Sequence, residues 1–69
     1  MEIKYSGHAE KRLIERGMEK WEVEHILKFP SYVKKSIEGK RIAVGESKGR
    51  EIKIVFIDME KYKKIVSVM

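Results

Sequence analysis

A histidine and two arginines stand at helical spacing near the start of the chain, at His8, Arg12 and Arg16. On a helix, residues four apart are neighbours, so His8 and Arg12 share a face and Arg16 lies one turn further on. An imidazole titrates near neutral pH, and guanidinium groups can hold a phosphate by paired hydrogen bonds. Metal-free RNA cleavage needs a base for the 2′-hydroxyl proton and cations for the phosphate. We therefore predict these three residues as a catalytic, phosphate-facing cluster.

A structural interpretation of this cluster stays open beside the functional one. His8 could hydrogen-bond a strand or a helix cap, and Arg12 could pair with Glu10 or Glu15. Arg16 lies close to the apolar stripe and could anchor the helix to a sheet. The two interpretations differ in whether the three side chains converge in an open cleft or are neutralised by carboxylates.

Three further cations could add positive charge to such a site. Lys48 and Arg50 flank a glycine in a turn-like segment, and Arg41 begins a strand-like run from which its side chain could project over a sheet face. We predict these three residues as nucleic-acid contacts, because Lys and Arg neutralise phosphate charge. The alternative for Lys48 and Arg50 is that they are solvated turn residues.

Other kinds of site have little support in the sequence. The chain has no cysteine, which excludes disulfides and thiolate metal ligands. His25 has no second histidine four residues on, so we predict no zinc site. Phosphate-loop, dinucleotide and paired-carboxylate motifs are missing too, and we predict no cofactor. Trp21 could stack on a base, or it could seal the edge of the core or dock on a partner.

Length and charge limit the classes of protein to which this chain can belong. Sixty-nine residues form one domain, 1–69, and a chain of this size is marginally stable without help. A net charge of +5 favours RNA, the ribosome or an acidic protein as partner. The 39% of charged residues is typical of proteins from hot habitats, where ion-pair networks are more useful. No apolar run is long enough to span a membrane, and no secretory signal is visible, so we expect a cytoplasmic location.

The elements that must position these residues are predicted from the periodicity of apolar residues and from the residues that begin or end helices and turns. Ser6 is a good helix N-cap, Gly17 is a natural helix end, and Pro30 ends a second helix. The predicted elements are a strand over 1–5, helices over 7–16 and 20–28, and strands over 32–37, 41–47, 51–57 and 62–69. This order predicts an α+β fold, β-α-α-β-β-β-β, with both helices on one face of a mainly antiparallel sheet. The strand 51–57 is apolar on both faces near its end, which indicates a central strand covered on both sides or one edge of an oligomer interface.

The motif S-x-H-A-x-x-R-x-x-x-R-G, formed here by Ser6 to Gly17, precedes a V-x-x-I-L helix that ends before Pro30 and a glycine-turned meander. With this order the chain resembles a widespread family of small uncharacterised domains grouped with RelE/ParE-like toxins and BrnT-like proteins. The resemblance implies a compact relative of the ribonuclease fold shared by RelE, barnase and colicin-type nucleases. Relatives often start the second helix with Ser or Thr, where this chain has Glu19.

The leading hypothesis is therefore a RelE/ParE-like, toxin-type RNA-interacting domain, with metal-free endoribonuclease activity as its enzymatic form. An acidic antitoxin would be the protein partner. The first alternative is a module of the same fold that binds RNA or protein without chemistry. The second is a small dimerisation domain whose interface is carried by the apolar strand 51–57, which would make the protein a homodimer.

Overall fold

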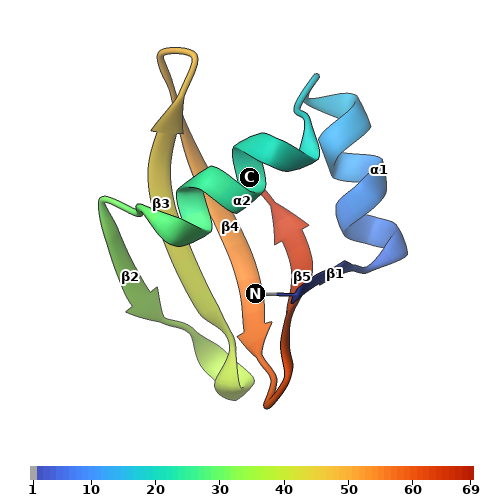
Figure 1. The fold of residues 1–69 in the computed structure, drawn as a ribbon, viewed down its shortest axis with the longest axis vertical. Helices are drawn as coiled ribbons and strands as arrows, with labels where there is room; N and C mark the ends of the chain where they lie inside the picture. Colours follow the sequence, from blue (N-terminus) through green and yellow to red (C-terminus); the bar gives the residue numbers. More distant parts are fainter. Residues whose placement is uncertain (1) are drawn as a thin grey trace.

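The computed structural model describes residues 2–69, and Met1, with which the first predicted strand began, lies outside them. Within the described residues the chain forms five strands, two α-helices and one 3-10 turn (Figure 1). In chain order these are β1 (Glu2–Tyr5), α1 (Gly7–Glu15), α2 (Lys20–Lys28), β2 (Tyr32–Lys35), η1 (Ile37–Gly39), β3 (Arg41–Ser47), β4 (Arg50–Asp58) and β5 (Tyr62–Val68). The predicted α+β class and element order are confirmed. Neither helix is long and apolar enough to cross a bilayer.

Helix α1 begins and ends at the predicted signals. The Ser6 side chain accepts a hydrogen bond from the Ala9 backbone N–H at 3.0 Å, which caps the first turn. At the other end Gly17 has a φ of 64°, and the N–H groups of Gly17 and Met18 donate to the carbonyls of Ile14 and Leu13. This paired closure is a Schellman motif, which needs a left-handed residue at that position. The helix therefore stops at Glu15, one residue before the predicted end.

The sheet has the strand order β1-β5-β4-β3-β2. Neighbouring strands are antiparallel except for β1, which pairs with β5 in parallel. Strand β4 lies in the centre, between β3 and β5, so the predicted central position of 51–57 is confirmed, although the helices cover only one of its faces. The other interpretation, that this strand forms one edge of an oligomer interface, stays a prediction. The edge strands are β1 and β2.

Both helices cover the same face of the sheet, as predicted. Ala9 and Leu13 of α1 and Val23 and Ile26 of α2 are buried in one core with the inward side chains of the strands. Those inward side chains are Ala43, Ile52, Ile54, Phe56, Ile65 and Val68. Figure 1 shows α1 at the β1–β5 side of the sheet and α2 crossing towards β3. The helices therefore leave β2, at the far edge, without helical cover.

Candidate nucleic-acid interface

The predicted catalytic cluster lies along α1 and just beyond it. His8 is exposed, Arg12 is half-buried, and Arg16 is exposed one residue past the end of the helix. Arg12 Nη1 lies 3.7 Å from Glu15 Oε1, so the charge of Arg12 is partly offset by the next turn of its own helix. The Nε of Arg12 is buried and has no hydrogen-bond partner. Arg12 therefore forms the ion pair with Glu15 that the structural interpretation predicted. His8 and Arg16 are exposed to solvent.

Arg50 holds the end of α1 against the start of β4. Its Nη1 donates a hydrogen bond to the backbone carbonyl of Arg16 at 3.0 Å. The last carbonyls of a helix lack intrahelical partners and carry partial negative charge, so a guanidinium group at this position is stabilising. The structure thus brings Arg16 and Arg50 together, because the side chain of Arg50 binds the backbone carbonyl of Arg16.

Lys48, the other predicted contact of this hairpin, lies over the start of α2. Its Nζ is 4.0 Å from Glu22 Oε2 and 5.8 Å from the centroid of the Trp21 ring. The Trp21 Nε1–H donates to Glu19, so the indole is held beside the helix start. Lys48 is left-handed, with a φ of 53°, and half of its side chain remains exposed. These contacts hold the tip of the β3–β4 hairpin against α2.

Glu22 is the buried centre of these contacts, and sequence reasoning did not identify it. Its side chain is fully buried, with Oε1 accepting from the Ser47 hydroxyl at 2.7 Å and Oε2 accepting from the Glu19 backbone N–H at 2.8 Å. The Ser47 hydrogen bond, the Glu19 N–H and the nearby cation Lys48 together lower the pKa of Glu22 despite its burial. A carboxylate held ionised in this way positions structure and is poorly suited to accept a proton near neutral pH.

A basic pocket lies at the opposite end of β3, around the predicted residue Arg41. Arg41 and Lys35 are directly paired across β3 and β2, so their side chains share one face of the sheet. The pocket has a volume of about 310 Å³ and is lined by Lys35, Ser36, Gly39, Lys40 and Arg41. Lys40 Nζ is 4.0 Å from Glu38 Oε2, whose side chain is 76% exposed, so this ion pair offsets little of the positive charge.

The β2–β3 connection shapes this pocket, and here the predicted strand boundary was wrong. The strand predicted over 32–37 ends at Lys35, and the chain then turns through η1. Glu38 and Gly39 are both left-handed, with φ of 59° and 74°, and the Ser36 N–H donates to the Lys40 carbonyl at 2.8 Å. The tight turn folds Lys40 back beside Lys35. Sequence reasoning missed Lys35, Ser36 and Lys40, although the run of cations on either side of Gly39 was a signal.

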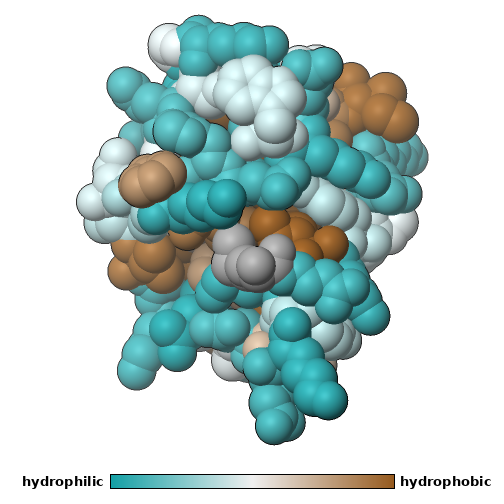
Figure 2. All heavy atoms as spheres, viewed as in Figure 1, coloured by the Kyte–Doolittle hydropathy of each residue, from teal (hydrophilic) through white to brown (hydrophobic). Residues whose placement is uncertain are grey.

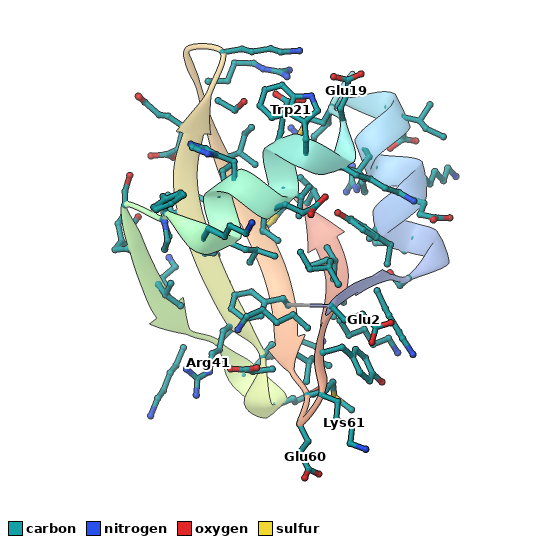
Figure 3. All side chains as sticks on the ribbon, viewed as in Figure 1. Glu2, Glu19, Trp21, Arg41, Glu60 and Lys61 are labelled. Atoms are coloured by element: carbon teal, nitrogen blue, oxygen red, sulfur yellow. The ribbon has the colours of Figure 1, made fainter. Side chains whose placement is uncertain are left out.

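The six predicted residues therefore do not form one patch. Arg16, Lys48 and Arg50 lie near the ends of α1 and the β3–β4 hairpin, whereas Arg41 lies at the other end of β3. Strand β3 has seven residues, so these ends are about 20 Å apart at 3.3 Å per residue. Figure 3 shows the same separation, with Arg41 at the lower part of the sheet and Trp21 near the β3–β4 hairpin.

Together these features define a small α+β domain with two basic regions and a buried, ionised carboxylate between helix and sheet. The chain belongs to the family described as a domain of unknown function, DUF4258, whose model matches residues 5–69. No curated protein and no solved structure matches the chain.

Proposed function

We propose that this chain is an RNA-interacting domain of the RelE/ParE-like toxin type, and that it holds the phosphate backbone in the pocket of Lys35, Lys40 and Arg41. The observation that carries the proposal is the convergence of three cations on one pocket with little opposing charge. Phosphate oxygens accept hydrogen bonds from ammonium and guanidinium groups, and Arg can do so with two at once.

The geometry of the pocket favours a polyanion over a small buried ligand. Arg41 and Lys35 are exposed on the strands, and the pocket opens at the edge of the sheet next to β2. A net charge of +5 attracts a nucleic acid over a longer range. The β2–β3 hairpin fixes the spacing of the cations, so less side-chain freedom is lost on binding.

RNA cleavage is a separate claim from RNA binding. It would depend on His8, an exposed imidazole in the first turn of α1, with Arg12 one turn further along the helix as the nearest predicted cation. An acidic protein that covers the basic surface would inhibit either activity, as expected of an antitoxin. The same domain without cleavage would be a binding module.

Fluorescence anisotropy with a labelled single-stranded RNA tests the binding proposal. Arg41→Gln and Arg16→Gln are matched variants, since each removes one exposed arginine charge from a different basic region. We expect Arg41→Gln to weaken binding several-fold and to reduce the slope of log K against log salt by about 0.7, the value for one phosphate contact on a single strand. Arg16→Gln should change binding much less. A larger effect of Arg16→Gln would assign binding to α1, and absence of binding by the unaltered protein would refute the proposal.

Cleavage is tested by incubating the same RNA with the protein in EDTA. Products that disappear in His8→Ala, while anisotropy shows retained binding, would support a metal-free endoribonuclease. Intact RNA with salt-dependent binding would support the binding module. Circular dichroism of each variant shows whether the fold is kept.

A further inference from the structure

Strand β2 is an edge strand that is open on its outer side. All four of its residues are exposed, with Tyr32 at 51% and Val33 at 46%. Two large apolar side chains flank it, Phe29 at 72% and Ile37 at 74%. Figure 2 shows hydrophobic atoms over the β2 side of the molecule within a mostly hydrophilic surface. An edge with unpaired backbone groups and exposed apolar side chains is a template for another strand.

The hydrogen bonds to β3 determine which backbone groups of β2 point outward. The Ser36 N–H donates to the Lys40 carbonyl, so the backbone N–H of Ser36 points towards β3. Backbone groups alternate in direction along an antiparallel strand, so the N–H and C=O groups of Tyr32 and Lys34 also point towards β3. The N–H and C=O groups of Val33 and the N–H of Lys35 then point away from the sheet. Pairing with another strand is limited to a short stretch, because the Ser31 N–H already donates to the Val44 carbonyl at 2.8 Å.

We propose that a second copy of this chain pairs with this edge, antiparallel, with Val33 opposite the second copy's Val33. This register lets the outward N–H and C=O of each Val33 bond reciprocally across a two-fold axis. It extends the two five-stranded sheets into one continuous sheet. The inference goes beyond RNA binding and does not depend on it.

The side chains of the edge are complementary to themselves in this register. Tyr32 lies opposite the second copy's Lys34, which sets a cation beside an aromatic ring, a favourable cross-strand pair. Phe29 and Ile37, which flank the strand, add exposed apolar surface beyond the two ends of the paired stretch. No lysine lies directly opposite another lysine. A second copy therefore fits better than an unrelated strand, which would have to supply this pattern by chance.

The interface is small and joins two positively charged molecules. It belongs at the low end of specific interfaces, below about 1,200 Å², so the dimer should dissociate on dilution. Each copy carries a net charge of +5, and salt screens their repulsion. Added salt should therefore strengthen the dimer while it weakens RNA binding, which separates the two proposals.

Cysteine cross-linking tests the register directly, because the chain has no native cysteine. Cα atoms of a hydrogen-bonded antiparallel pair are about 5.5 Å apart, within the range of about 4.4–6.8 Å that a disulfide accepts. We expect Val33→Cys to form disulfide-linked dimers on mild oxidation of the RNA-free protein. Lys35→Cys is the matched control, because in this register the two copies of residue 35 lie on opposite sides of the axis. Equal cross-linking of the two variants would overturn the register.

Sedimentation velocity over a range of protein concentrations tests the dimer itself. Val33→Pro removes the outward N–H without removing a bond to β3, and we expect it to stay monomeric where the unaltered protein dimerises. Val33→Arg places two like charges together at the axis and serves as a second variant if Val33→Pro does not fold. An unaltered protein that is monomeric up to millimolar concentration would overturn the proposal, as would folded variants that dimerise like it.

Discussion

The hydroxyl of Ser47 donates a hydrogen bond to Glu22 Oε1 at 2.7 Å, which ties the end of β3 to the first turn of α2 through a fully buried carboxylate. The other oxygen of Glu22 accepts from the Glu19 backbone N–H at 2.8 Å and lies 4.0 Å from Lys48 Nζ. One side chain therefore caps a helix and holds a hairpin against it. The arrangement is favourable because each carboxylate oxygen has a donor, whereas an unpaired buried charge would be costly.

Replacing Ser47 by alanine should destabilise the protein by about 1–3 kcal/mol, because it leaves a buried carboxylate oxygen without its donor. Urea denaturation of the purified variant measures the change in the free energy of unfolding. Ser31→Ala is the matched control, since Ser31 is exposed and such substitutions usually change stability by less than about 0.5 kcal/mol. Equal stabilities of the two variants would show that the Ser47 contact contributes nothing.

Glu22 should make the protein sensitive to acid. Its pKa in the folded state lies below the ordinary value of 4.5, so ionised Glu22 favours the folded state. The stabilisation is present above pH 4.5 and is lost as the pH falls through the lowered pKa. Glu22→Gln should be less stable at neutral pH and should lose less stability below pH 4.5 than the unaltered protein. The measurement is the free energy of unfolding across that range.

Glu24→Gln controls for the loss of one carboxylate at an exposed position of the same helix. It should keep the acid sensitivity of the unaltered protein. If Glu22→Gln and Glu24→Gln lose stability in parallel as the pH falls, Glu22 is not the source of the acid transition.

Tyr5 should produce a second pH effect, at the alkaline end. Burial, followed by the nearby charge of Glu24, raises the pKa of Tyr5 from 10.0 to about 12. The neutral phenol therefore favours the folded state, and its contribution is full below pH 10 and lost as the pH rises towards 12. Tyr5→Phe should flatten the stability curve in this window, as measured by urea denaturation. Tyr32→Phe, at the exposed edge, should retain the loss, and an unchanged curve in Tyr5→Phe would contradict the assignment.

Local signals made much of the fold predictable from the sequence. Ser6 caps α1 and Gly17 closes it because both act through hydrogen bonds and dihedral angles of the nearest residues. Helix α2, over 20–28, and strand β3, over 41–47, have the predicted bounds. The strand over 32–37 was predicted too long because Ile37, an apolar β-branched residue, continues the strand pattern. It lies instead in the turn η1, where it is 74% exposed.

The candidate sites were less predictable, because they depend on residues far apart in the chain. Glu22 and Ser47 are 25 residues apart, and nothing in the spacing of α2 distinguishes a buried glutamate from a solvated one. The placement of His8 and Arg12 on α1, with Arg16 at its end, was predictable because helical spacing is visible in a sequence. The pairing of Arg41 with Lys35 depends on the hairpin register, which becomes known only once the turn at Glu38 and Gly39 is placed.

Gly45 lies where Ile26 of α2 packs closely on the sheet, and its substitution tests that packing. A Cβ atom there would stand 2.9 Å from Cγ2 of Ile26 and 3.2 Å from its Cγ1. Because Ile26 is fully buried, α2 would have to shift or Ile26 would have to leave its rotamer, which typically costs about 1–3 kcal/mol.

Gly7→Ala is the matched control, since an added Cβ there meets nothing within 4 Å. Replacement of glycine by alanine in the first turn of a helix is neutral or stabilising by up to about 1 kcal/mol. Thermal and urea denaturation should therefore rank Gly45→Ala below the unaltered protein and Gly7→Ala at or above it. A Gly45→Ala protein as stable as Gly7→Ala would mean that α2 does not pack on β3 at the described distance.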